Sequence, residues 1–381
     1  MFKNIKILII LVTAMNLRLA VTAVTPLFSA IQRSLRVDSA LTALLVTLPL
    51  LCFAIGAILT PRLIRTLGIV PLLWSANGLL LVANLLRPAT TATLLAGTVL
   101  IGLAIAVLNV LIPTMIAQTT TAGVTRLTSA YAVTMNVVAA LGTAVAIPLA
   151  AHWGWQLVLR GFALPAGLAL LVLLRLPRHS FSRSVTANTT QQTGLWKTLR
   201  YDADARRLTL FMGLQSLTFY SLTAWLPTIF RTLGATPVLA GNLLAVFQLV
   251  GIPAALVLNL MTNRRRLLWG VLGGYVLGGL SLLWSGMGWW LSASLLGFTS
   301  SLIFTLALNL IATSSPHVTV IANRSAVAQS LGYLLAAVGP VMLGRLHDGW
   351  GSWLPVGLVL AGLVLLTFVT GLQLTHRQLN D

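Results

Sequence analysis

The sequence predicts an all-α membrane protein whose twelve transmembrane helices form two six-helix halves. Three observations lead to this prediction: a low share of charged residues, a series of long apolar runs, and an internal repeat. The 381 residues are 57% hydrophobic and only 8% charged, whereas about a quarter of the residues in a soluble domain are charged. So few charges cannot cover a water-facing surface, and lipid must therefore surround most of the chain.

Twelve runs of the chain are apolar over the length that a spanning helix requires, about 20 residues. Cuts at charges, prolines and glycines place them at 5–30, 40–60, 69–86, 92–117, 127–149, 157–175, 207–230, 239–260, 267–285, 290–312, 323–343 and 354–374. Their connections are short except for one polar segment rich in Ser, Thr and Gln. We therefore predict an N-terminal bundle over 1–175, a cytoplasmic linker over 176–206 and a C-terminal bundle over 207–381.

The basic residues predict the orientation in the membrane. The chain has 24 Lys and Arg against 5 Asp and Glu, a net charge of +19. They lie in short segments between apolar runs and not in one stripe, which argues against nucleic-acid binding and indicates the positive-inside pattern of membrane proteins. We expect a multi-pass protein of the cytoplasmic membrane with both termini in the cytoplasm. The external segments then hold only Arg33, Arg36, Arg87, Arg160, Arg231 and Arg345.

The two halves share short patterns in the same order. Thr22-Ala23-x-x-Pro26 in the first run matches Thr223-Ala224-x-x-Pro227 in the seventh. The fifth run reads Ala139-Ala140-x-Gly142 and is followed by Trp153-Gly154, while the eleventh reads Ala336-Ala337-x-Gly339 and is followed by Trp350-Gly351. A parallel repeat of six plus six helices is typical of the major facilitator fold, in which substrate binds near the bilayer midplane.

Arg18 is the most informative residue for function. It lies about 17 Å into the first run, near the middle of a hydrocarbon core about 30 Å thick. A charge at that depth is expensive and normally faces a cavity or a partner. All five acids lie outside the apolar runs: Asp38, Asp202, Asp204, Asp348 and Asp381. Arg18 therefore either fastens helices through their carbonyls or binds a substrate that supplies the negative charge.

Other polar side chains inside the runs extend this candidate site. Thr22 follows Arg18 by one helical turn, and Asn309 continues a stripe with Ser301 and Thr305. We expect hydrogen bonds to substrate from Asn109, Tyr131, Gln248, Gln329 and Tyr333, and apolar walls from Tyr220 and Trp225. The fifth run also holds Asn136. Hydrogen bonding between helices is the alternative role for each of these side chains.

The predicted spans lack the residue types that several kinds of catalysis and metal binding require. No predicted span contains His, Asp or Glu, and the chain has a single cysteine, Cys52. A carboxylate pair, a metal cluster and an acid–base pair are therefore not expected at membrane depth. The sequence also has no phosphate-binding loop for ATP hydrolysis. We accordingly expect neither an enzyme nor a bound cofactor or metal.

The sequence resembles the cyanate porter family of the major facilitator superfamily, which includes cyanate and 2-nitroimidazole transporters. The segments that carry this resemblance are Asn16-Leu-Arg18 with the following TAVTPLF, LNVLIPTMI over 108–116, SAYAVTMN with the GWQ ending, LTAWLP over 222–227, and QSLGYLLAAVGPVMLGRLHD over 329–348. Within this family, the sequence is more similar to the 2-nitroimidazole exporter branch than to the cyanate branch. One departure is the loop after the second span, where Arg65-Thr66-Leu67-Gly68 lacks the Asp of the usual Asp-Arg-x-Gly pattern.

These observations together predict a secondary transporter for a small anion or a small polar nitro-heteroaromatic compound, working by alternating access, with efflux as one direction to consider. A channel-like pore is an alternative, and so is a broad drug-efflux transporter, although large cations would favour an acidic cavity. A receptor on the same scaffold would need a sizeable soluble output domain. The expected partners are a small-molecule substrate and the lipid bilayer, and the expected state is a monomer. Facilitated transport, exchange and anion-coupled symport all remain open.

Overall fold

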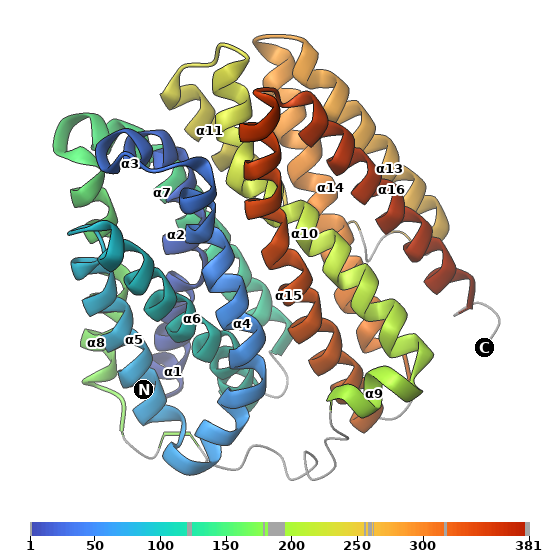
Figure 1. The fold of residues 1–381 in the computed structure, drawn as a ribbon. Helices are drawn as coiled ribbons and strands as arrows, with labels where there is room; N and C mark the ends of the chain where they lie inside the picture. The colour runs from blue at the N-terminus through green and yellow to red at the C-terminus, as the bar shows by residue number, and fades with distance from the viewer. Residues whose placement is uncertain are drawn as a thin grey trace. The chain divides into compact units, whose positions relative to one another are not determined.

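The computed structural model describes residues 2–119, 124–177, 180–181, 195–254, 257, 261, 263–315 and 318–377. The secondary structure assigned to these residues is helical throughout. The chain divides into two compact units, Met1–Ala187 and Asn188–Asp381 (Figure 1). Much of the predicted linker over 176–206 lies outside the described residues, so the predicted division of the chain stays a proposal.

In the N-terminal unit, the described residues form eight α-helices and one short 3₁₀ helix. Their bounds are α1 Phe2–Ala14, α2 Asn16–Thr22, η1 Thr25–Leu27, α3 Phe28–Leu35, α4 Ser39–Leu67, α5 Ile69–Leu86, α6 Thr91–Thr119, α7 Val124–Gly161 and α8 Leu164–Leu173. A single residue, Gly68, connects α4 to α5. Both of these helices pack extensively against α6, which joins the three into one layer.

The first predicted span is not one continuous helix. α2 ends at Thr22, and the chain passes through a turn into η1 before α3 begins. Pro26 explains this break, because a proline lacks an N–H donor and its ring clashes with the carbonyl four residues earlier, which here belongs to Thr22. Thr25 Oγ1 donates to that Thr22 carbonyl at 3.0 Å. The helix that carries Arg18 therefore ends one turn beyond it.

The C-terminal unit is built in the same way. It contains α9 Leu195–Tyr201, α10 Ala203–Thr232, α11 Pro237–Leu249, α13 Arg264–Leu280, η3 Ser281–Leu283, α14 Met287–Ala312, α15 Val318–Trp350 and α16 Leu354–Arg377. The most extensive helix pair in the unit is α10 with α15, whose ribbons lie side by side in Figure 1. Unlike Pro26, Pro227 lies inside a continuous helix.

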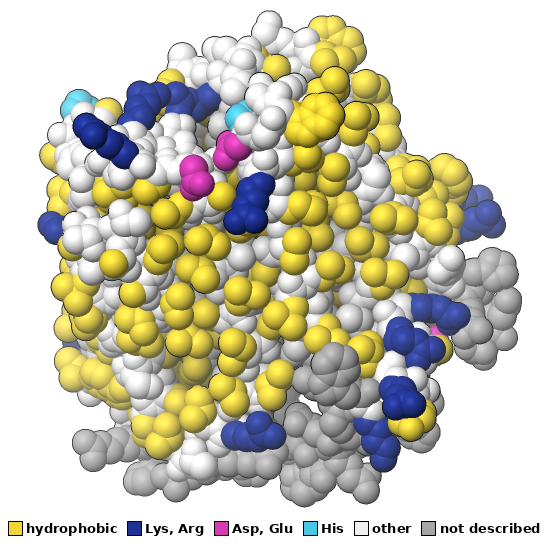
Figure 2. Space-filling model, viewed as in Figure 1, with side chains coloured by type: hydrophobic (Ala, Val, Ile, Leu, Met, Phe, Trp, Pro, Cys, Tyr) yellow, Lys and Arg dark blue, Asp and Glu magenta, His cyan; other side chains and the backbone are white. Residues whose placement is uncertain are grey.

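Nine helical segments in the described part of the chain are long and apolar enough to cross a membrane. One of them, Ala130–Leu173, covers the fifth and sixth predicted spans, which a kink at Gly154 separates. The seventh predicted span lies in α10, which is less apolar, and the eighth lies partly in α11 and partly outside the described residues. The all-helical membrane fold is thus confirmed, while the number twelve stays a prediction. Hydrophobic side chains cover the middle of the face in Figure 2, with Lys and Arg toward its two ends.

The internal repeat appears in the packing of each unit. A Cβ on Gly142 of α7 would meet Leu19 of α2 at 2.2 Å, and a Cβ on Gly339 of α15 would meet Ser221 of α10 at 2.4 Å. Glycine therefore permits the close approach of the corresponding helix pair in both units. Gly154 and Gly351, which also match in the repeat, both adopt positive φ, 78° and 62°. Glycine reaches this region without a steric penalty.

Two of the described acids outside the predicted spans accept hydrogen bonds from backbone N–H groups at the start of a helix. Asp38 accepts from the Leu41 N–H at the start of α4, and Asp202 accepts from the Ala205 N–H at the start of α10. Arg324 of α15 donates to both carboxylate oxygens of Asp202, at 2.7 and 3.1 Å. The same side chain reaches Asp204 and the Ser314 carbonyl. These contacts join the ends of α10, α14 and α15.

Candidate functional site

Arg18 lies half-buried on α2 and contacts α7. Its Nη1 donates to Asn136 Oδ1 at 2.8 Å. The close approach of the two helices at Gly142 and Leu19 brings these side chains within reach of each other. Asn136 is neutral, so this hydrogen bond orients the guanidinium without cancelling its positive charge. An oriented cation in a spanning helix is suited to binding an anion or a strongly dipolar group.

Three other residues of the N-terminal unit were predicted to bind substrate, and their surroundings differ. Tyr131 lies on α7, within electrostatic range of the Arg18 charge. Thr22 is buried, and its hydroxyl donates to the Arg18 carbonyl at 3.1 Å, so it contributes to its own helix. Asn109 is exposed on α6. The structure thus brings Tyr131 toward Arg18 and directs the Thr22 hydroxyl to the backbone.

A second arginine, Arg87, contacts the backbone of α2 near the C-terminal end of that helix. Arg87, directly after α5, is fully buried, and its Nη1 donates to the Ala20 carbonyl at 3.1 Å. The last carbonyls of a helix lack partners within the helix, and a cation there is favourable. Its Nε and Nη2 have no hydrogen-bond partner among the described residues. Sequence reasoning assigned Arg87 to an external segment and did not anticipate this contact.

The C-terminal unit brings together an aromatic cluster made of Phe219, Tyr220, Phe247 and Tyr333. The rings of Tyr220 and Tyr333 lie 6.4 Å apart, edge to face. Phe219 contacts Tyr220 at 5.2 Å and stacks on Phe247 at 5.8 Å. The rings come from α10, α11 and α15. Aromatic faces arranged in this way can pack against a planar ring of a ligand.

Polar side chains on the neighbouring helices complete the description of this unit. Gln329 lies one turn before Tyr333 on α15, and its Nε2 donates to Ser325 Oγ at 2.8 Å. Gln248 on α11 is 3% exposed, and its Nε2 donates to the Leu244 carbonyl of its own helix. The buried Oδ1 of Asn309 on α14 has no hydrogen-bond partner among the described residues. Because Gln329 and Tyr333 are four residues apart, they share one face of α15.

Trp225 is placed inside the helix packing of the C-terminal unit. Its Nε1 donates to the Pro340 carbonyl of α15 at 2.8 Å, and the side chain is 2% exposed. Its ring also lies 5.6 Å from that of Trp353. These contacts join α10 to α15 and to the segment before α16. They give Trp225 a structural role, whatever it contributes to a substrate site.

The register of the internal repeat shows how the two units differ. The offset that aligns Thr22 with Thr223 pairs Arg18 with Phe219, and the offset that aligns Gly142 with Gly339 pairs Asn136 with Tyr333. The polar contact of one unit thus corresponds to aromatic residues in the other. Asn136 and Phe219 were not among the predicted binding residues, although this register could have selected both.

The described residues contain no group of three or more His, Cys, Asp or Glu that could hold a metal ion. What the geometry offers is therefore recognition by hydrogen bonds, charge and ring stacking. The cation and amide lie in one unit and the aromatic rings in the other.

Comparisons with known proteins agree with this description. Residues 10–340 match the family model described as Major Facilitator Superfamily. The chain is 36% identical over 372 residues to an uncharacterized transporter, YycB, of Bacillus subtilis (strain 168), covering 94% of this chain and 90% of that protein. It is 34% identical over 375 residues to the 2-nitroimidazole transporter of Escherichia coli (strain K12), covering 95% and 93%.

Two further similarities are more distant. The cyanate transport protein CynX of Escherichia coli (strain K12) is 25% identical over 377 residues, covering 95% of this chain and 96% of that protein. The crystal structure of a mutant of the nucleoside transporter NupG superposes with a TM-score of 0.79 at 14% identity, covering 97% of this chain and 100% of that one. The family model and the relatives together confirm the family resemblance inferred from the sequence motifs, and the superposition agrees with the fold.

Proposed function

The chain belongs to the Major Facilitator Superfamily, and from that premise we propose that it carries a small anion or a small nitro-heteroaromatic compound across the cytoplasmic membrane. Secondary transport of a small substrate follows from the family and the relatives. The relatives named for 2-nitroimidazole and cyanate support this choice of substrate class. Alternating access, with both termini in the cytoplasm and a monomer as the working unit, belongs to the same proposal.

The observation that carries the proposal is the Arg18–Asn136 contact. An arginine that fastens helices through their carbonyls donates as Arg87 does to Ala20, whereas Arg18 Nη1 donates to a side-chain amide. The hydrogen bond to a neutral amide orients the guanidinium, and that bond does not itself neutralise the positive charge. Nitro and carboxylate groups are planar and present two oxygens, which suits the planar donor fork of arginine.

Within the C-terminal unit, the aromatic cluster is the proposed contact for a substrate ring. Tyr220 and Tyr333 would contact the ring of a nitro-heteroaromatic substrate, with Gln329 and Gln248 as hydrogen-bond donors. Asn109, Tyr131 and Asn309 would add polar contacts, and Thr22 and Trp225 would each stabilise their own helix, α2 and α10. Because no predicted span holds a carboxylate to titrate, we propose facilitated transport, exchange or anion-coupled symport in place of proton coupling through the protein.

A thermal-shift screen tests this proposal directly. The purified protein is titrated with 2-nitroimidazole, cyanate, nitrate and small carboxylates, because a ligand that binds the folded state stabilises it by mass action. Counterflow in proteoliposomes then separates a carrier from a pore, since only a carrier shows saturable exchange of labelled for unlabelled substrate. Stabilisation by large hydrophobic cations and not by these compounds would contradict the proposal and favour a broad drug-efflux function.

A further inference from the structure

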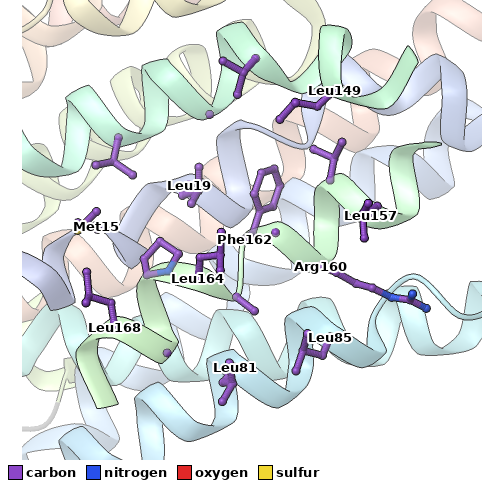
Figure 3. Close-up of a pocket in the computed structure, with 18 of the residues that line it drawn as sticks. Met15, Leu19, Leu81, Leu85, Leu149, Leu157, Arg160, Phe162, Leu164 and Leu168 are labelled. Atoms are coloured by element: carbon purple, nitrogen blue, oxygen red, sulfur yellow. The ribbon is translucent and has the colours of Figure 1, made fainter. Parts of the chain in front are cut away.

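The N-terminal unit contains a large apolar cavity that the proposed transport function does not use. Its volume is about 960 Å³, and it lies between α2, α5, α7 and α8. Its walls are almost wholly aliphatic, with Leu81 and Leu85 from α5, Val145 and Leu149 from α7, and Leu168 from α8. Figure 3 shows Leu81, Leu85, Leu149 and Leu168 around the cavity, which we call the α7–α8 groove.

The groove is open along its margins. Leu141 on α7, Leu164 on α8 and Leu171 on α8 are 58%, 76% and 63% exposed, although all three line it. From Val138 to Trp153 it follows α7 for about 22 Å at 1.5 Å per residue. That length exceeds half of a hydrocarbon core about 30 Å thick. An open aliphatic groove of this length on a membrane-spanning unit suits an alkyl chain.

A tryptophan and an arginine, residue types that are common at membrane interfaces, line one end of the groove. Trp153 lines this end and is 64% exposed, as is typical of tryptophans at the level of lipid head groups. Arg160 is the charged residue of the lining, and Figure 3 shows its side chain extending away from the apolar walls. A long basic side chain with an apolar stem and an outward head is suited to contact a head-group phosphate.

We propose that the α7–α8 groove binds one anionic phospholipid, with an acyl chain along α7 and α8 and the head-group phosphate on Arg160. Charge complementarity selects this occupant, because the lining offers one cation and no acid. The apolar walls leave a polar ligand without hydrogen-bond partners, whereas an acyl chain needs none.

The groove reaches the helix that carries Arg18. Met15 and Leu19 line it, and Leu19 is the residue next to Arg18 on α2. Leu19 also packs against Gly142, where the position of α2 on α7 is fixed. A bound acyl chain would therefore support α2 at the level of the Arg18–Asn136 contact. Delipidation is expected to lower both the melting temperature and substrate binding.

The full-length protein, purified and delipidated in detergent, provides the test. Melting is measured with phosphatidylglycerol, phosphatidylcholine and inorganic phosphate, and bound lipid is counted by native mass spectrometry. The variants are Arg160→Gln and Arg160→Lys, with Arg33→Gln as the matched control, since Arg33 is an exposed arginine of the same unit outside the lining. Gly167→Phe fills the groove, because a Cβ there meets only Leu81 at 3.8 Å.

Phosphatidylglycerol is expected to bind and stabilise the wild type more than phosphatidylcholine does. Arg160→Gln should weaken phosphatidylglycerol binding about fivefold, equivalent to about 1 kcal/mol, whereas Arg160→Lys and Arg33→Gln retain it. Gly167→Phe should lose bound lipid, and the Arg160 variants decide the question if Gly167→Phe does not fold. Equal stabilisation by phosphatidylcholine, an equal effect of inorganic phosphate, or Arg160→Gln behaving like Arg33→Gln would overturn the proposal.

Discussion

The guanidinium of Arg18 donates a 2.8 Å hydrogen bond to the side-chain oxygen of Asn136, which lies 118 residues later on a different helix. One partner of this intramembrane cation is therefore a neutral side-chain amide. Two roles follow for the pair, one in orienting a charge and one in joining α2 to α7. The predictions below separate these roles and test the packing and orientation of the chain.

The first prediction concerns Arg18. Arg18→Gln should leave yield and melting close to wild type, because it removes a costly charge within a spanning helix. Substrate binding should fall on the order of tenfold to a hundredfold, as expected for a lost charge-assisted hydrogen bond. Arg18→Lys should lose much of the binding of a bidentate ligand. Thermal shift with and without ligand measures both effects. Poor folding with intact ligand binding would instead indicate that Arg18 fastens helices.

Asn136→Asp is the complementary test. The added carboxylate should pair with Arg18 and cancel the charge that the substrate requires. We expect unchanged or raised melting together with lost binding of anions, whereas Asn136→Ala should weaken binding less. If Asn136→Asp transports anionic substrate at the wild-type rate, the charge of Arg18 does not recognise the substrate.

The aromatic cluster predicts a split between substrates. Tyr333→Leu removes a ring that contacts Tyr220, and aromatic contacts contribute about 0.5–1.5 kcal/mol. Binding of nitroimidazoles should weaken by about threefold to tenfold, while binding of cyanate, which has no ring, should not change. Tyr333→Phe retains the ring and should behave like wild type toward nitroimidazoles. Competition assays with both compounds make the comparison, and equal losses for both would count against ring recognition.

The packing of α11 on α14 depends on a glycine. A Cβ on Gly297 would lie 2.1 Å from the Phe247 carbonyl oxygen. Gly297→Ala must therefore move one helix, and we expect it to destabilise the fold by about 1–3 kcal/mol. Gly273→Ala on α13 is the control, because a Cβ there meets nothing within 4 Å. It should be neutral or slightly stabilising, since alanine favours helix over glycine. Melting temperatures of the two variants measure the difference.

The Asp202–Arg324 ion pair predicts how stability depends on pH. Burial raises the pKa of Asp202, but hydrogen bonds from Arg324 and from backbone N–H groups outweigh it and hold the pKa below its usual value of 3.8. The stabilising contribution is therefore complete above the unfolded pKa and is lost as the pH falls through the folded one. Melting should be insensitive to this group above about pH 5 and should drop below about pH 4. The Asp202→Asn variant should have a lower melting temperature than the wild type at neutral pH, and its melting temperature should fall less as the pH is lowered. An equal fall in the variant and the wild type would contradict this assignment.

The orientation rests on charge bias alone and can be measured. A reporter fused after Thr189, outside the described residues, should read as cytoplasmic, and one fused at Gly286 should read as external. These positions belong to segments that the positive-inside pattern assigns to opposite sides. A consistent external signal at Thr189 would invert the predicted topology and exclude the twelve-span arrangement.

The sequence predicted the helical membrane fold and its family, because these follow from composition and motifs, while the role of Arg18 in binding stays a prediction. It did not predict the Arg18–Asn136 contact, since that contact depends on how closely α2 approaches α7 at Gly142. The burial of Arg87 was missed for a related reason. A charge beside Pro88 suggests a loop, and only the break in the first span supplies the carbonyl that the arginine binds. The contact of Trp225 with Pro340 likewise depends on tertiary packing.

The one-residue connection at Gly68 has a mechanical consequence. α4 contains 29 residues and is therefore about 43 Å long, and it turns into α5 without any slack in the chain. A one-residue connection keeps the end of α4 and the start of α5 close together, so we expect a displacement of one helix at this end to displace the other. Because both also rest on α6, the three helices would swing together, and a conformational change would concentrate its bending at the prolines inside the helices.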